Sequence, residues 1–414
     1  MSPRELAVRA KEASFISSKL TTDKKNAILE RLKGLLNLER SYIFAENKKD
    51  LELASRSGLS KSMIERMKVD DKVINDMISS LNDVISLPDP VGEIVKMWKR
   101  PNGLLVGRMR IPIGVIFVIY ESRPNVTIEA FSLCLKSGNT VILKGGSEAS
   151  NSNRALCTLI RRAMSEEGVS PDIVQMVEST ERSYVYELLT LDDYIDLVIP
   201  RGGEELIRTV VEKSRIPVLK HFKGVCHIFV DESADLNMAY EVCLNAKIQK
   251  PATCNAMETL LVHERIARNF LPEMAKKFQE NGVRLKGCEK TREILEGVEP
   301  AQESDWYEEY LDLVLSIKVV SDIEEAIAHI RKYGSNHTDA IMTQDYKKAW
   351  RFLREVNSSL VLVNASTRLN DGFQLGLGAE MGISTTKLHA FGPMGLEELT
   401  VTKFIAFGDG QLRY

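Results

Sequence analysis

The strongest constraint on the fold is an alternation of short apolar runs and helical segments between residues 111 and 213. Apolar runs bounded by turn residues predict buried strands at Val115–Ile119, Val141–Leu143, Ile173–Val177 and Leu197–Ile199. Apolar residues at three- and four-residue spacing predict helices at Thr127–Lys136, Asn151–Glu167, Arg182–Leu189 and Glu204–Lys213. Strands that alternate with helices form parallel sheets, so this region is predicted to be an α/β domain.

A second α/β unit is predicted further along the chain. Its expected strands are Cys226–Val230, Thr259–Val262, Asp339–Met342 and Ser359–Asn364, and its clearest helices are Leu236–Lys247 and Ile323–Tyr333. Residues 1–86 are predicted to be helical, and Ser2, Pro3 and Glu5 form a capping sequence at their start.

A hairpin is predicted between the helical residues 1–86 and the first α/β domain. Met97–Arg110 contains the turn Pro101-Asn102-Gly103 between two short β-prone runs. Such a hairpin either pairs with another subunit or lies on the surface of its own chain, and the residues alone do not distinguish the two.

Composition excludes several classes of function. The chain carries 55 Lys plus Arg against 58 Asp plus Glu, a formal net charge of −3, so it has no basic field for nucleic acid. Its longest near-continuous apolar run, Ile113–Tyr120, is far shorter than the ~20 residues that span a bilayer. The N-terminal residues contain no apolar core of a secretory signal.

Cysteine and histidine spacing argues against a disulfide scaffold and against a structural metal. The six cysteines include no C-x-x-C pair, and the six histidines show no H-E-x-x-H or zinc-type spacing. We therefore expect a reduced, cytoplasmic enzyme that needs no metal.

Two glycine turns could bind phosphate, because each joins a predicted strand to a helix whose N-terminal amides attract anions. They are Lys144-Gly145-Gly146-Ser147 and Arg201-Gly202-Gly203. Neither turn matches the G-x-G-x-x-G or Walker pattern. Their succession on neighbouring strand–helix units, one with Lys and one with Arg, favours a dinucleotide, although Gly-Gly turns often serve only as connections.

Cys254 is the candidate nucleophile. It lies in a loop that follows Pro251 and leads into a predicted strand, and functional side chains are concentrated in such loops. A thiolate stabilised there by backbone amides would react near neutral pH. The alternative is a buried, inert cysteine, which is the expectation for most of the other cysteines.

Four stretches identify a family resemblance: Tyr120–Thr127, Lys250–His263, Asn364–Gly372 and Gly376–Glu398. Through them nearly the whole chain resembles the γ-glutamyl phosphate reductases, which belong to the aldehyde dehydrogenase superfamily. The resemblance implies two Rossmann-like parallel α/β domains and a small oligomerisation hairpin.

The resemblance also implies the domain boundaries. An NADP-binding domain is expected at 1–225 with part of 385–405, interrupted by an oligomerisation hairpin at 96–110. A catalytic domain is expected at 226–384, and residues 405–414 are expected to form a tail that serves as an oligomerisation strand.

The family's functional residues carry over to matching positions. The resemblance implies that Cys254 is the nucleophile, Asn125 the oxyanion-hole amide and Lys144 the lysine that meets the adenosine ribose. Glu309 aligns with the residue that holds the nicotinamide ribose. Ser147 replaces the Glu of NAD-preferring relatives, and without that carboxylate a 2′-phosphate meets no repulsion, so NADPH is expected.

One departure from the hydrolytic relatives is informative. His221 occupies the position where those enzymes place a Glu as base for the deacylating water. Without that carboxylate a thioester on Cys254 would survive to exchange with phosphate. Two other interpretations of His221 stay open: a neutral base that does the same work, or a structural residue.

For the substrate, Arg123 and Arg368 are the cations we would test against its anionic groups, and Glu380 against its ammonium group. Each of the three fits a structural ion pair equally well.

The function implied is NADPH-dependent reduction of L-glutamyl 5-phosphate to L-glutamate 5-semialdehyde and phosphate, in proline biosynthesis. The expected partners are this substrate, further copies of the chain and a glutamate kinase that hands over the acyl phosphate. An ordinary aldehyde dehydrogenase that forms the free acid, and a non-catalytic scaffold, remain alternatives. A requirement for phosphate distinguishes the implied reductase from an ordinary aldehyde dehydrogenase.

Overall fold

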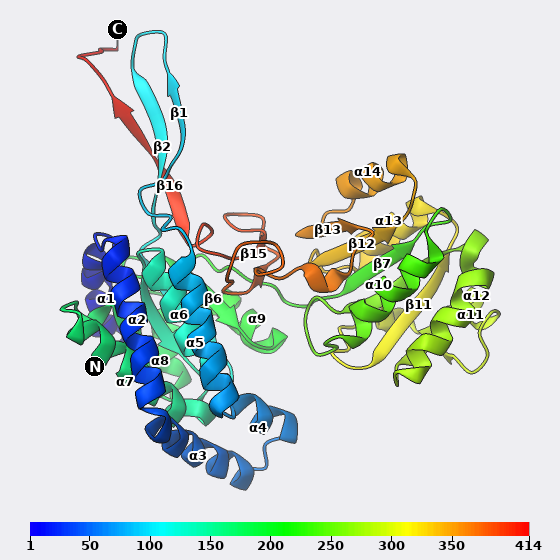
Figure 1. The fold of residues 1–414 in the computed structure, drawn as a ribbon, viewed down its shortest axis with the longest axis horizontal. Coiled ribbons are helices and arrows are strands. Elements are labelled where there is room, and N and C mark those ends of the chain that lie inside the picture. Colours follow the sequence, from blue (N-terminus) through cyan, green and yellow to red (C-terminus); the bar gives the residue numbers. More distant parts are fainter. Residues whose placement is uncertain (414) are drawn as a thin grey trace. The chain divides into compact units, whose positions relative to one another are not determined.

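Two parallel sheets organise the chain, one in each of two compact units. The computed structural model describes residues 1–413, apart from the side chain of Ser62 (Figure 1). Unit 1 comprises Met1–Lys220, Gly376–Gly382 and Met394–Tyr414, and unit 2 comprises His221–Leu375 and Ile383–Pro393.

The chain passes between the two units after residues 220, 375, 382 and 393, and these bounds differ from the expected ones. The first crossing comes at residue 221 rather than 226. Residues 376–382, expected in the catalytic domain, belong to unit 1. Residues 383–393 belong to unit 2, and within them β14 (Ile383–Ser384) pairs antiparallel with β15 (Gly392–Pro393).

The sheet of unit 1 is parallel and four-stranded, in the order β5-β4-β3-β6. Its strands are β3 (Val115–Tyr120), β4 (Thr140–Lys144), β5 (Val174–Met176) and β6 (Leu197–Arg201). All six residues of β3 are buried, as expected for an apolar central strand. The predicted strand at 173–177 is shortened because Pro171 starts a 3-10 turn that includes Ile173.

Helices accompany this sheet in the predicted order. They are α6 (Asn125–Lys136), α7 (Ser150–Glu166), α8 (Arg182–Leu188) and α9 (Glu204–Lys213), with the 3-10 turns η1 (Ser147–Ala149) and η2 (Pro171–Ile173). Five helices precede them: α1 (Pro3–Ser17), α2 (Thr22–Leu38), α3 (Arg40–Arg56), α4 (Lys61–Met67) and α5 (Asp71–Ser86). The capping box of Ser2 and Glu5 forms at the start of α1.

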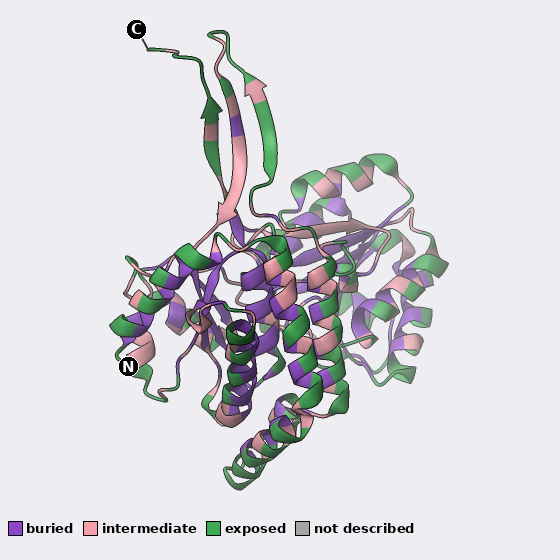
Figure 2. Cartoon of the chain, turned by 60° about the vertical axis from the view of Figure 1, so that its left-hand side comes forward, coloured by how far each residue is buried: buried purple, intermediate pink, exposed green. Residues whose placement is uncertain are grey.

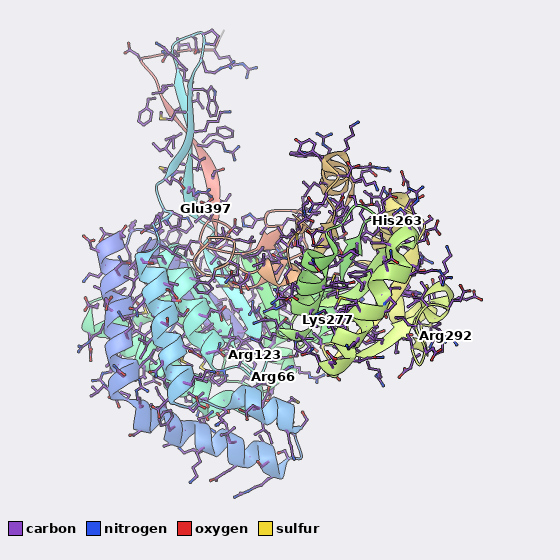
Figure 3. All side chains as sticks on the ribbon, turned by 45° about the vertical axis from the view of Figure 1, so that its right-hand side comes forward. Arg66, Arg123, His263, Lys277, Arg292 and Glu397 are labelled. Atoms are coloured by element: carbon purple, nitrogen blue, oxygen red, sulfur yellow. The ribbon has the colours of Figure 1, made fainter. Side chains whose placement is uncertain are left out.

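A separate three-stranded antiparallel sheet belongs to unit 1. It has the order β1 (Ile94–Lys99), β2 (Leu105–Pro112), β16 (Thr400–Phe407). The predicted hairpin therefore forms, and β16 pairs with β2 along its full length, from Thr400 opposite Pro112 to Phe407 opposite Leu105. Most of this sheet is exposed or half-buried (Figure 2). Arg110 of β2 forms ion pairs with Glu93 and with Glu397. Figure 3 labels Glu397.

Unit 2 contains a parallel seven-stranded sheet in the order β10-β9-β11-β8-β7-β12-β13. Its strands are β7 (Cys226–Val230), β8 (Met257–His263), β9 (Arg284–Gly287), β10 (Glu299–Pro300), β11 (Val314–Val320), β12 (Thr338–Met342) and β13 (Leu360–Val363). Its helices are α10 (Leu236–Ile248), α11 (Glu264–Glu280), α12 (Glu289–Arg292), α13 (Ile323–Tyr333) and α14 (Tyr346–Glu355), with the 3-10 turns η3 (Glu303–Tyr307) and η4 (Thr367–Leu369).

Alternate residues of the central strands build two separate cores. Ile228 and Val230 of β7 pack with α10 and α11, whereas Phe229 packs with α13 and α14. Because successive side chains of a strand point to opposite faces, the sheet is covered by helices on both faces. Two parallel α/β sheets, one per unit, confirm the predicted fold class.

No helix among residues 1–413 combines the length and apolar character needed to cross a lipid bilayer.

Candidate active site

Cys254 lies in the loop between α10 and β8 of unit 2 and is half-buried. His221 comes shortly before β7, and His337 directly before β12. Strands β8, β7 and β12 are neighbours in the parallel sheet, so their amino ends meet at one edge. This strand order brings Cys254, His221 and His337 together, with one ligand atom from each lying within 4.8 Å of the others.

His337 is the buried member of this group. Its Nδ1 lies 2.7 Å from Oγ1 of Thr338, and its Nε2 is buried without a hydrogen-bond partner. Burial, together with the nearby His221, lowers the pKa of His337 to about 3. The ring is therefore neutral at physiological pH. Sequence analysis missed His337, because only the strand order shows that it lies beside Cys254.

The backbone of Cys254 is held from two sides. A Cβ at Gly224 would come within 1.9 Å of the Cys254 carbonyl oxygen, so only glycine allows the loop after His221 to pass this closely. The thiol of Cys226 donates to the same oxygen at 3.1 Å. Burial raises the pKa of Cys226 well above its usual value, so this thiol stays protonated and remains a donor.

Arg368 of η4 donates hydrogen bonds to the loop that carries Cys254, called the nucleophile loop. It donates to Gln249 at 2.8 Å, to Thr253 at 3.0 Å and to the Asn255 side chain. Burial lowers the pKa of Arg368, and the charge of the Cys254 thiolate opposes that shift. The guanidinium therefore both orders this loop and favours the ionised thiol.

The Glu309 segment is anchored by a buried ion pair. The backbone N–H of Leu311 donates to Glu258 Oε1 at 3.2 Å, and Glu258 pairs with Lys247 at 2.6 Å. Both side chains of this pair are fully buried. Burial raises the pKa of Glu258 to about 8 and lowers the pKa of Lys247. Glu309 itself is half-buried in the loop that this pair supports.

In unit 1, Lys144 ends β4 and is half-buried, and Ser147 begins η1 and is exposed. Burial lowers the pKa of Lys144, while the Glu148 carboxylate raises it. That carboxylate accepts hydrogen bonds from the backbone and the hydroxyl of Ser122. Glu148, the acidic residue next to Ser147 in the sequence, is therefore already hydrogen-bonded to Ser122.

The second glycine turn forms hydrogen bonds with other segments of unit 1. The N–H of Gly203 donates to the Glu121 carboxylate at 3.0 Å, and Arg201 donates to the Met381 carbonyl at 2.6 Å. A Cβ at Gly202 would lie 2.5 Å from the Glu121 carboxyl carbon. The anion at this helix N-terminus is therefore the chain's own Glu121, a contact that the turn sequence did not indicate.

The remaining predicted residues also belong to unit 1, whereas Cys254 and Arg368 belong to unit 2. Asn125 is the first residue of α6 and lines a pocket of about 260 Å³ with Arg66 of α4 and Glu129 of α6. Arg123 precedes α6 and is exposed; Figure 3 labels it together with Arg66. Glu380 is half-buried within Gly376–Gly382.

Comparison with known proteins identifies the family of this chain. The model of the "Aldehyde dehydrogenase family" matches residues 5–293. The chain belongs to the aldehyde dehydrogenase family. Its similarity to curated members of this family is high over nearly the full length. A "Gamma-glutamyl phosphate reductase" of Thermodesulfovibrio yellowstonii is 59% identical over 98% of this chain and 97% of the relative.

Another reductase of that name, from Desulfatibacillum aliphaticivorans, is 56% identical over 99% of this chain and 98% of the relative. The crystal structure of the Thermotoga maritima protein of the same name matches with a TM-score of 0.98 and 48% identity, over 100% of both chains. These relatives identify the chain as an oxidoreductase of the aldehyde dehydrogenase family, as predicted.

Proposed function

We propose that this chain reduces L-glutamyl 5-phosphate to L-glutamate 5-semialdehyde and phosphate with NADPH, through a thioester on Cys254, as a step of proline biosynthesis. The relatives named γ-glutamyl phosphate reductase support the reaction. The structural observation that carries it is the environment of Cys254: the Arg368 guanidinium donates to its loop, and His221 lies within 4.8 Å of the thiol. The family resemblance implies a carboxylate at the position of His221 in hydrolytic relatives.

The chain's own residues account for acylation. Arg368 favours the thiolate, and the thiolate attacks the carbonyl carbon of the acyl phosphate. The bond from that carbon to the phosphate oxygen breaks, phosphate leaves with the bonding electrons, and a thioester remains. The Cys254 backbone N–H is proposed to bind the developing oxyanion, because Gly224 and Cys226 fix this backbone. Asn125 keeps its predicted oxyanion role as part of this proposal.

The thioester persists because water lacks a strong base beside it. A carboxylate there would activate water for hydrolysis, whereas the groups that lie within 4.8 Å of the thiol include His221 and the neutral His337. When bound, the nicotinamide supplies a hydride to the thioester carbon. Breaking the C–S bond then releases the aldehyde and returns the thiolate to Cys254.

The cofactor of this family is a nicotinamide dinucleotide, and we assign NADPH. Lys144 offers a half-buried ammonium beside a glycine turn, which fits the adenosine ribose and its 2′-phosphate. The exposed Ser147 places no carboxylate there, and Glu148 is bound to Ser122. Glu309 is assigned to the nicotinamide ribose. At the second turn, pyrophosphate would have to displace Glu121 from Gly203.

For the substrate, Arg123 and Glu380 keep their proposed roles toward an anionic group and the ammonium. Arg368 is reassigned from general anion recognition to the nucleophile loop, where its bonds to Gln249 and Thr253 already direct it.

Phosphate dependence is the decisive experiment. Oxidation of glutamate semialdehyde by NADP⁺ should depend on phosphate and saturate with it, because phosphate must take the acyl group from Cys254. Oxidation at full rate in phosphate-free buffer would identify an ordinary aldehyde dehydrogenase instead. Cys254→Ser should abolish turnover while NADPH still binds, and retained turnover in this variant would refute the thioester mechanism.

We also propose that copies of the chain associate through the β1-β2-β16 sheet, which exposes Phe404, Phe407 and Val401. Exposed apolar patches of this kind commonly mark interfaces.

A glutamate kinase is the proposed supplier of the labile acyl phosphate. In a coupled assay with the kinase, an added acylphosphatase should leave semialdehyde formation largely intact if hand-over is direct. A proportional loss of product would indicate free diffusion of the intermediate.

We place the enzyme in the cytoplasm, because all six cysteines are free thiols, as expected in a reducing compartment. Cell fractionation that recovers the protein elsewhere would contradict this assignment.

A further inference from the structure

The proposed reaction uses the sulfur of Cys254 but gives no role to the buried His337 beside it. This histidine is fully buried, and its Nε2 has no hydrogen-bond partner. Leaving such a nitrogen unpaired carries a free-energy cost. A ring nitrogen of this histidine also lies within 4.8 Å of the Cys254 sulfur and of a nitrogen of His221, so the three side chains form a potential ligand set. Neutral imidazole, the form that burial enforces here, is the form that binds metals.

The ligand atoms at this edge of the sheet match a soft divalent cation. In a tetrahedral zinc site, bonds of about 2.3 Å to sulfur and 2.0–2.1 Å to nitrogen separate the ligand atoms by roughly 3.5 Å. The three candidate atoms of His221, Cys254 and His337 already lie within 4.8 Å of one another, so small side-chain rotations would complete the set. Three protein ligands would leave a fourth position for water.

The electrostatics also favour a thiophilic ion. Arg368 stabilises the Cys254 thiolate, which is the form of cysteine that coordinates metal. A second group of potential ligands, Asp231, Glu232 and His263, differs in this respect. There the ammonium of Lys348 lies 2.6 Å from Asp231 and 2.9 Å from Glu232, so the negative charge is already neutralised.

We propose that His221, Cys254 and His337 form a binding site for Zn²⁺ or a similar thiophilic divalent cation, and that the bound ion blocks the nucleophile. Coordination ties up the sulfur lone pair that would attack the substrate. The site is inhibitory, and it is assembled from the starts of three neighbouring strands, which explains why no ligand spacing marks it in the sequence.

The test is a Co²⁺ titration of the complete chain without substrate or cofactor. We expect one Co²⁺ per chain, with a thiolate-to-cobalt charge-transfer absorption that Zn²⁺ displaces. The absorption should disappear in Cys254→Ser and persist in Cys288→Ser, since Cys288 is the other thiol that is not fully buried. His337→Gln and His221→Gln should each weaken binding at least about tenfold.

Two results would overturn the site: no thiolate-to-cobalt absorption in the unmodified protein with excess Co²⁺, or unchanged absorption in Cys254→Ser. If the buried His337→Gln variant fails to fold, the half-exposed His221 provides the same test. Zn²⁺ should also slow iodoacetamide labelling of Cys254, and EDTA should restore it; labelling at an unchanged rate refutes the block. None of these measurements uses turnover, so they can fail while the proposed reaction holds.

Discussion

In the proposed function, residue 147 sets the charge that a 2′-phosphate would meet, and with it the preferred dinucleotide. Ser147→Glu is expected to shift the preference from NADPH towards NADH, because two like charges about 4 Å apart near a protein surface repel by up to about 4 kcal/mol. The ratio of kcat/KM for the two cofactors measures this shift, and we expect at least a tenfold change.

Ser147→Gln is the matched control, since it adds similar volume without charge. A cofactor ratio that does not change in Ser147→Glu would show that residue 147 is remote from the 2′-phosphate.

In the proposed mechanism, Arg368 stabilises the thiolate of Cys254. Arg368→Gln is expected to reduce iodoacetamide labelling of Cys254 at pH 7 about tenfold, the factor that corresponds to 1.4 kcal/mol of lost thiolate stabilisation. Mass spectrometry of the labelled peptide gives the rate. Arg354→Gln, on the exposed side of α14, serves as the control and should leave the rate unchanged. Equal labelling rates in Arg368→Gln and the unmodified chain would show that the guanidinium does not activate the thiol.

At the scale of elements, the loop before β7 must pass close to the nucleophile. Gly224→Ala is expected to lower turnover by orders of magnitude, because its methyl group would sit on the Cys254 carbonyl and displace the loop. Circular dichroism and steady-state kinetics together separate this effect from unfolding.

Gly34→Ala is the contrasting change. It lies in the exposed interior of α2, with nothing within 4 Å of its Cβ position. It should raise stability by about 0.5–1 kcal/mol without changing the kinetics. Full activity in Gly224→Ala would show that this close approach is not needed.

Helix α13 carries a histidine that makes unit 2 sensitive to acid. His329 is buried against Trp306 and Tyr333, neither ring nitrogen has a hydrogen-bond partner, and burial holds its pKa well below 6.5. Below pH 6.5 the unfolded state therefore binds a proton that the folded state does not. The free energy of unfolding should fall by up to about 1.4 kcal/mol per pH unit from this residue.

His329→Phe should reduce that slope, as measured by urea unfolding at pH 7, 6 and 5. His389→Gln, a change at an exposed histidine, is the control. The same slope in His329→Phe and the unmodified chain would assign the acid sensitivity to other groups.

At the scale of the whole molecule, the β1-β2-β16 sheet presents apolar side chains that the chain itself does not cover. Phe404 is 65% exposed and Phe407 is 59% exposed. Phe404→Glu is expected to yield a smaller species by light scattering, because a buried, unpaired carboxylate at an interface is unfavourable. Tyr346→Glu, at a 75% exposed residue of α14, should leave the mass unchanged. An unaltered mass in Phe404→Glu would place the interface elsewhere.

Local pattern was sufficient for the four strands of the first sheet and for β7, β8, β12 and β13 of the second, but it left β9, β10 and β11 unpredicted. β3 is apolar along its length, and β4 and β7 each contain three consecutive apolar residues, because burial on both faces favours that composition. It was insufficient for α11, which contains Pro272 and was not predicted. There the burial of Phe270, Leu271 and Phe278 outweighs the hydrogen bond that proline removes.

The sequence by itself determined the α/β class, the candidate thiol and the residue at position 147, because these depend on composition, periodicity and matching motifs. Only the tertiary structure showed that His337 joins His221 beside that thiol. His221 and His337 reach Cys254 because β7 lies between β8 and β12, and strand order is a product of long-range packing. The same holds for β16, whose partner strand lies almost three hundred residues earlier in the chain.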